Sequence, residues 1–201
     1  FLVITYSPRQ DLYASKTLDD LRKLRNSLQQ IESVATVLTI LDVPLIDSPR
    51  LGIGDLNNGI RTLETPDIDK NLVRKEFATS PFYSNLLVSP DAKTTALQVI
   101  FKRDENYHSL LQIRNNLRAK SLESKLTSEE TLELKSAIRS FDEHVIKRSE
   151  QEARDIARVR SIMDEHRQNA ELFLGGVPMI VADMIDFIRH DLTSFGLGVL
   201  V

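Results

Sequence analysis

Along the first 43 residues the spacing of hydrophobic positions changes from a strand pattern to a helix pattern and back to a strand pattern. Residues 1–6 (FLVITY) are apolar and β-branched, which is typical of a strand. Over 18–31 the apolar residues recur every three or four positions, which predicts a helix that Ser15 or Thr17 could cap. A second β-branched run covers 34–43. This β-α-β order predicts two parallel strands that are neighbours or near neighbours in one sheet.

The next 60 residues contain shorter elements. Residues 45–66 hold several Gly and Pro residues, which is typical of a surface loop. A short helix is predicted over 67–77, before the break at Ser80-Pro81. Two β-rich runs, 85–89 and 94–101, flank a four-residue turn, and this pattern predicts a β-hairpin.

A stretch without Gly or Pro extends from 91 to 174 and consists mostly of good helix formers. Its one break is Thr127-Ser128 followed by two acids, which is an N-cap signature. We therefore expect two helices, over 105–124 and 128–168.

The two helices differ in length. At 1.5 Å per residue the first is about 30 Å long and the second about 60 Å. The simplest arrangement is an antiparallel hairpin over 105–146, with 147–168 returning along the sheet. Apolar residues at steps of three and four favour contact between the two helices, and recognition of another protein is the alternative use of this face.

The last part of the chain returns to strand and helix. Residues 171–175 predict a strand, and Pro178 suits the first position of a helix whose apolar face extends to Leu192. The element order predicts an α+β fold of the ferredoxin-like type with insertions. The expected parts are an α+β body formed by 1–104 and 169–192, an inserted helical hairpin over 105–168, and a final segment 193–201.

Composition narrows the function classes. The 201 residues include 26 Lys and Arg and 29 Asp and Glu, and the formal charge is −3. This balance argues against a broad nucleic-acid surface, because neutralising phosphates takes clustered Lys and Arg. The absence of Cys excludes disulfides, Cys-zinc sites and thiol catalysis. We predict no catalytic, cofactor-binding or metal-ligating residue, and we expect no enzymatic activity.

Several motifs have a functional and a plain interpretation. The histidines, His108, His144, His166 and His190, are far apart, which favours surface positions over a metal site. Residues 67–71 resemble the start of a calcium loop. However, the sixth and twelfth positions hold Leu and Ala instead of Gly and Glu, which favours a charged first helical turn.

Three further clusters favour structural roles. Gly52-Ile53-Gly54 lacks the spacing of a phosphate-binding loop. Gly175-Gly176 would let the chain turn from strand to helix without a Cβ clash. The cationic cluster Arg22, Lys23 and Arg25 is expected on a solvated helix face, balanced by neighbouring aspartates.

Four segments together resemble a known family. They are FLVITYSPRQDL, LDDLRKLRNSLQQIESVATVLTILDVPL, NLLVSPDAKTTALQVIF and LFLGGVPMIVADMIDFIRHDL. In this order they resemble the first extracytoplasmic loop of exporters of the resistance-nodulation-division (RND) superfamily, near the MMPL and hydrophobe-exporter branch. The resemblance covers about 1–43, 84–102 and 171–192, and it does not cover the long helical segment.

The resemblance implies a location and a set of partners. In that family the loop joins the first two transmembrane helices of an inner-membrane protein and forms ferredoxin-like porter subdomains on the periplasmic side. Residues 193–201, which carry no charge, would then begin a truncated transmembrane helix, whereas docking of this tail into the core is the alternative. The proton-relay carboxylates of the family lie in membrane helices, so no residue of this chain inherits that role.

The sequence therefore predicts an extracytoplasmic porter domain of a proton-driven exporter with a hydrophobic or lipid-like substrate. Its partners would be the transmembrane and second periplasmic domains of the same chain, and other protomers or envelope proteins that the hairpin contacts. Two alternatives remain open: a membrane-anchored periplasmic adaptor and an extracytoplasmic sensor domain. The sequence identifies no substrate-binding residue and no nucleic-acid partner.

Overall fold

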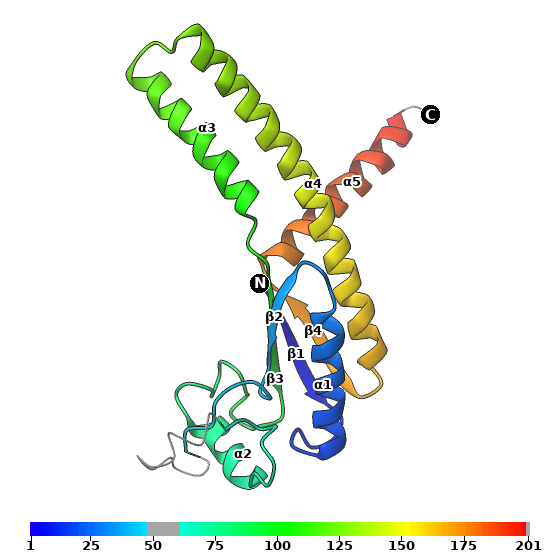
Figure 1. Cartoon of the computed structure of the whole chain (residues 1–201). Coiled ribbons are helices and arrows are strands. Elements are labelled where there is room, and N and C mark those ends of the chain that lie inside the picture. Colours follow the sequence, from blue (N-terminus) through cyan, green and yellow to red (C-terminus); the bar gives the residue numbers. More distant parts are fainter. Residues whose placement is uncertain (48–60, 200–201) are drawn as a thin grey trace. The chain divides into compact units, whose positions relative to one another are not determined.

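The computed structural model describes residues 1–47 and 61–199, which divide into two compact units. The first unit contains the described residues of Phe1–Phe101 and Asp155–Val201, and the second unit is Lys102–Arg154. The elements are labelled in Figure 1 and are, in chain order, β1 (Leu2–Pro8), α1 (Ser15–Gln29), β2 (Val34–Leu38), α2 (Lys70–Thr79), β3 (Thr95–Phe101), α3 (Glu105–Glu123), α4 (Ser128–His166), β4 (Ala170–Gly175) and α5 (Val177–Val199).

The first unit is built on a four-stranded sheet with the order β2-β3-β1-β4. All three neighbouring pairs are antiparallel, and Ile4 in β1 lies opposite Leu97 in β3 and Leu174 in β4. Because β1 and β2 both run antiparallel to β3, they are parallel to each other with one strand between them. The expectation of parallel near neighbours is confirmed, and the chain has a mixed α+β fold.

The β-hairpin predicted over 85–101 forms only in its second half. Residues 95–101 are β3, but 85–89 make no strand. Asn85 has a φ of 64°, and Val88 makes only single bridges, to Ser84 and Thr95. The prediction is wrong there because a local turn uses the backbone groups: the Tyr83 carbonyl accepts from the Leu87 N–H at 2.8 Å and from the Val88 N–H at 3.0 Å.

The second strand is shorter than predicted. β2 ends at Leu38 instead of residue 43. A carboxylate oxygen of Asp42 accepts hydrogen bonds from the Thr39 N–H at 2.9 Å and from the Thr39 hydroxyl at 2.8 Å. This local turn satisfies backbone groups that a longer strand would have paired, so the β-branched run bends after its first five residues.

One face of the sheet carries the core. The inward-facing residues of β1 (Leu2, Ile4 and Tyr6) are fully buried. α1 and the last three turns of α4 cover this face (Figure 1), and their buried contacts are Leu18, Leu21, Leu24, Leu28, Ile156, Val159, Ile162 and Met163. The opposite face is less covered, because Val3 and Thr5 are half-buried and Phe173, which lies opposite Thr5 in the register, is 59% exposed.

The start of α1 differs from the prediction. Neither Ser15 nor Thr17 caps it; the N-cap is Ala14, whose side chain makes no capping hydrogen bond. Instead Asp11 organises the preceding turn, because its carboxylate accepts from the Tyr13 N–H at 2.8 Å and its carbonyl accepts from the Ala14 N–H at 3.1 Å. The first turn of α1 therefore has no side chain bonded to its free N–H groups among the described residues.

The second unit contains α3 and the first 27 residues of α4. The N-cap signature predicted at the start of α4 is confirmed. Thr127 Oγ1 accepts from the Glu130 N–H at 3.2 Å, and the Glu130 carboxylate accepts from the Thr127 N–H at 2.9 Å. Phe141 of α4 is buried against α3. The ring centroids of Phe141 and Tyr107 are 5.4 Å apart, and Cζ of Arg114 lies 4.0 Å from the centroid of the Phe141 ring. The apolar face between the two helices therefore includes a cation–π contact.

Candidate functional site

A buried polar cluster in the first unit is centred on Asp20 of α1. Its Oδ2 accepts a hydrogen bond from the Tyr6 hydroxyl at 2.8 Å. Its Oδ1 lies 2.9 Å from Nδ1 of His166 and accepts from the Asn169 side-chain amide at 2.7 Å. The Asp20 and His166 side chains are only 11% and 9% exposed. This carboxylate therefore has three partners, which come from β1, the end of α4 and the turn before β4.

Local structure explains how these groups meet. Tyr6 is an inward-facing residue of β1, and His166 is the last residue of α4. Burial raises the pKa of Tyr6 well above its usual range, and the hydrogen bond to Asp20 and the charge of Asp20 raise it further. The Tyr6 hydroxyl therefore stays protonated and remains a donor to the carboxylate.

A pocket of about 360 Å³ opens beside Asp20. Its walls come from the residues that follow β1, from one face of α1 and from the turn between α4 and β4. The Arg9 N–H donates to the Asn169 carbonyl at 2.9 Å and so joins two of these walls. The charged side chains that line the pocket are Arg9, Lys16, Asp19, Asp20 and Lys23.

The histidines do not all lie on the surface as predicted. His166 is 7% exposed, and the fold brings it into contact with Asp20, which lies 146 positions away in the sequence. His144 is half-buried in the second unit, with Nε2 2.7 Å from Oδ2 of Asp104, the N-cap residue of α3. His108 and His190 are exposed, as expected. Among residues 1–47 and 61–199, no group of three or more His, Asp or Glu side chains is arranged to hold a metal ion.

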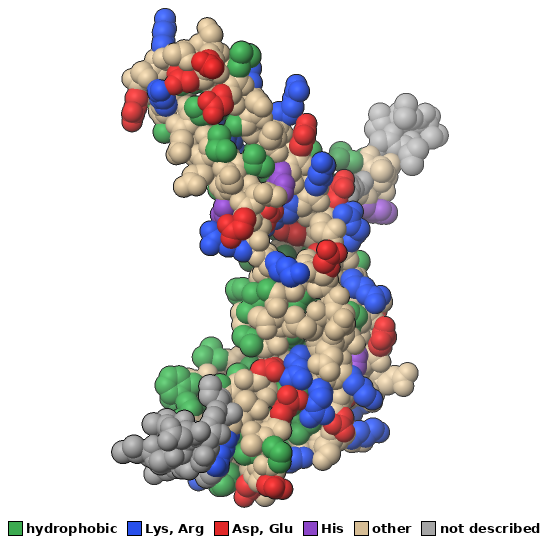
Figure 2. Space-filling model, viewed as in Figure 1, with side chains coloured by type: hydrophobic (Ala, Val, Ile, Leu, Met, Phe, Trp, Pro, Cys, Tyr) green, Lys and Arg blue, Asp and Glu red, His purple; other side chains and the backbone are tan. Residues whose placement is uncertain are grey.

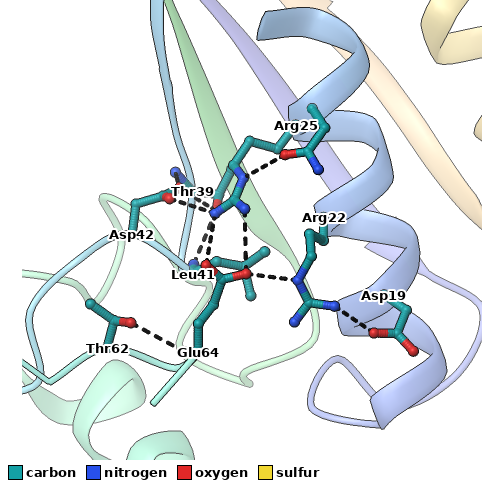
Figure 3. A network of polar contacts seen from close by, with 9 residues as sticks. Asp19, Arg22, Arg25, Thr39, Leu41, Asp42, Thr62 and Glu64 are labelled. Atoms are coloured by element: carbon teal, nitrogen blue, oxygen red, sulfur yellow. Dashed lines mark hydrogen bonds and ion pairs between the residues drawn. The ribbon is translucent and has the colours of Figure 1, made fainter.

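Two of the three cations that were expected on a solvated face of α1, Arg22 and Arg25, belong to a network of ion pairs (Figure 3). Arg25 lies 2.6 Å from Asp42 and 3.3 Å from Glu64, and Arg22 bonds Glu64 at 2.7 Å. Arg22 also pairs with Asp19, as expected, and its side chain is 40% exposed. The prediction is wrong for Arg25, whose side chain is 16% exposed, because Glu64 and Asp42 belong to loop segments that the helical pattern cannot place beside α1. Lys23 is exposed, as predicted.

The network changes the ionisation of Glu64. Partial burial disfavours its charged form, but the hydrogen bonds from Arg22 and Arg25, together with their charges, outweigh that effect. The pKa of Glu64 therefore lies below its ordinary value. The ionised carboxylate ties α1 to the segment that precedes α2.

The calcium-like motif has a structural role. α2 begins at Lys70, and Asp69 is its N-cap, with Oδ1 accepting from the Asn71 N–H at 2.8 Å. The favoured interpretation, a charged start to a helix, agrees with this geometry. Gly52-Ile53-Gly54 lies outside the described residues.

Gly176 makes a close approach between strand and helix. Its φ is +124°, and a Cβ built on it would lie 3.0 Å from the Phe1 carbonyl oxygen and 3.2 Å from the Leu2 Cα. The structure thus agrees with the expectation that a glycine is needed to turn the chain from β4 to α5. Pro178 is the second residue of α5 instead of the first.

An apolar face of α5 is exposed within the first unit. It contains residues spaced by three or four positions, namely Val177, Ile180, Val181, Met184, Phe187, Ile188, Leu192 and Phe195. Asp183 accepts from Arg160 of α4 at 2.8 and 2.9 Å. No helix in the described ranges is both long and apolar enough to cross a bilayer.

Sequence reasoning missed the Asp20 cluster and its pocket. A partial signal exists, because Lys16, Asp19, Asp20 and Lys23 share one helix face at steps of three and four. No local pattern identifies His166 and Asn169 as partners of this face. No protein-family model matches the chain, and neither a curated protein nor a solved structure is similar enough to count as a match.

Proposed function

We propose that this chain is an extracytoplasmic porter domain of an RND-type exporter. The observation that supports it most is the strand order β2-β3-β1-β4 with every pair antiparallel. In this order β1, α1 and β2 form one β-α-β unit, and β3, α4 and β4 form a second one whose strands alternate with those of the first. Two interleaved units of this kind are the arrangement of a ferredoxin-like fold. The second unit, Lys102–Arg154, is an insertion between β3 and β4.

Two surfaces of the first unit support a role among other protein parts. The sheet face that carries Val3 and Thr5 is only half-buried, and Phe173 on it is exposed. β4 leads through Gly176 directly into α5, whose apolar face is also exposed. In the proposed exporter, a neighbouring porter domain covers the sheet face, and α5 continues toward the membrane domain that drives transport.

The proposed domain has no covalent chemistry of its own and contributes walls to a path for hydrophobic or lipid-like substrates. The helical hairpin would contact other protomers or envelope proteins. Leu122 and Leu132, near the turn between α3 and α4, are 89% and 68% exposed, which fits such a contact. The same observation also favours an adaptor, the second candidate, in which the hairpin joins envelope proteins without a transport path.

Two measurements on the natural gene product test the proposal. These 201 residues contain no Cys, so Lys125→Cys in the exposed turn between α3 and α4 provides a single label site once other Cys are replaced by Ser. A membrane-impermeant maleimide should label it in intact cells, and labelling only after lysis would contradict an extracytoplasmic domain. Deleting the gene should raise accumulation of a hydrophobic dye, and the wild-type gene should restore export. External labelling with unchanged accumulation would favour the adaptor.

A further inference from the structure

Three exposed cationic side chains surround the Asp20 pocket. Arg9, Lys16 and Lys23 line it, and none of them forms an ion pair or a side-chain hydrogen bond with the part of the chain that the structure describes. This contrasts with Arg22 and Arg25 on the same helix, whose charges are both paired. The lower part of Figure 2 shows Lys and Arg side chains interspersed with Asp and Glu side chains over the first unit.

The two acids in the pocket wall are both engaged in contacts within the protein. Asp19 is paired with Arg22. Asp20 is held by Tyr6, His166 and Asn169. Cations therefore outnumber acids three to two around the pocket, and only the cationic side chains have no bonded partner among the described residues.

The backbone adds to the same field. Lys16 and Thr17 lie in the first turn of α1, which carries no acidic residue and no capping side chain. The free N–H groups and the positive end of the helix dipole favour an anion there. The frame is fixed, because Asn169 is bonded both to Asp20 and to the Arg9 N–H.

We propose that this pocket binds a small phosphate-type oxyanion, such as inorganic phosphate or a phosphate monoester. A phosphate dianion suits three cations better than a ligand with a single carboxylate does. Its oxygens can accept a charge-assisted N⁺–H···O⁻ hydrogen bond from each cation. The volume of about 360 Å³ fits a small ligand. The overall charge of −3 disfavours a long polyanion. This assignment is independent of the exporter proposal and can hold or fail without it.

A titration followed by NMR tests the site. The ¹⁵N-labelled 201-residue chain is titrated with inorganic phosphate and with glycerol 3-phosphate at constant ionic strength, using chloride as the reference. Amide signals of Lys16, Thr17 and Asn169 should shift and saturate with a Kd of about 1 mM. Cosedimentation with vesicles that contain phosphatidic acid, compared with neutral vesicles, tests a lipid headgroup as the source of the same chemistry.

Matched variants separate the site from general attraction to a cationic surface. Lys16→Ala/Lys23→Ala should weaken binding at least about tenfold, because two charge-assisted contacts are lost. Lys75→Ala/Lys93→Ala removes two exposed lysines elsewhere in the first unit and should leave the affinity unchanged. Circular dichroism confirms that both double variants fold.

The outcomes are distinct. Saturation by soluble phosphates, or vesicle binding that only the pocket variant abolishes, supports the site and identifies its ligand source. Shifts that fail to saturate up to about 50 mM, with no specific vesicle binding, overturn it, because a millimolar site would be filled at that concentration. Equal loss of affinity in both double variants overturns it as well.

Discussion

Nδ1 of His166 lies 2.9 Å from Oδ1 of Asp20, although 146 positions separate the two residues. The first residue ends α4 and the second lies on α1, and these are the two helices that cover the sheet. Tyr6, from the sheet itself, donates to the other oxygen of the same carboxylate. One side chain thus joins both helices and β1.

Replacing Asp20 with Ala should destabilise the first unit by about 2 to 4 kcal/mol, because it leaves Tyr6, His166 and Asn169 without their shared acceptor. The measurement is the free energy of opening from slow amide hydrogen exchange in β1. Asp19→Ala is the matched control: its side chain is 62% exposed and pairs with Arg22 at the surface, so the change should stay within about 1 kcal/mol. Equal effects of both variants would contradict a central role for Asp20.

Local patterns were sufficient for the helices and most strands. The apolar spacing from Leu18 to Leu28 and the Thr127 cap signature depend on residues close in sequence, and both match the structure. The failed hairpin strand at 85–89 is replaced by turns closed on the Tyr83 carbonyl, which compete with the strand pairing that the β-rich pattern predicts. Ala14 as the cap of α1 likewise follows from the turn organised by Asp11.

The polar site was much less predictable. An exposed carboxylate and a buried one can both lie at the border between the apolar and polar faces of an amphipathic helix. Their spacing from the apolar residues does not distinguish them. Asp19 and Asp20 are adjacent, yet one is exposed and paired locally while the other is buried against His166. The difference comes from groups far away in the sequence, because Tyr6, His166 and Asn169 surround Asp20.

The Glu64 ion pairs should make stability depend on pH on the acid side. Because the folded state lowers the pKa of Glu64 below its ordinary value of 4.5, its contribution is present above that value and is lost as the pH falls through the folded pKa. At neutral pH, Glu64→Gln should cost about 0.5 to 1 kcal/mol, a modest figure because the side chain is 33% exposed.

Urea denaturation of wild type and Glu64→Gln across pH provides the test. The difference in unfolding free energy should shrink as the pH falls below about 4.5, and it should vanish once the carboxyl group is protonated in the folded state as well. A difference that stays constant from neutral pH to about pH 3 would show that the effect is not the charge of Glu64.

The cap of α4 should stabilise the start of this helix. Thr127→Ala removes the acceptor of the Glu130 N–H and should cost about 1 kcal/mol of local stability. Amide exchange at Glu130 and Thr131 should become faster, while exchange in β1 of the first unit should not change. Thr127→Ser retains the hydroxyl and should restore most of the protection, which separates the hydrogen bond from a general effect of substitution.

Gly176 and Gly175 provide a matched pair at the junction of β4 and α5. Gly176→Ala should destabilise the first unit by about 2 kcal/mol or more, because it combines a φ of +124° with a Cβ 3.0 Å from the Phe1 carbonyl oxygen. Gly175→Ala places its Cβ 3.8 Å from the Val3 carbonyl oxygen, an ordinary contact, and should change stability by less than about 1 kcal/mol. Amide exchange in β1 and β4 measures both. If Gly176→Ala proved as mild as Gly175→Ala, the strand-to-helix turn would not depend on the left-handed conformation at this residue.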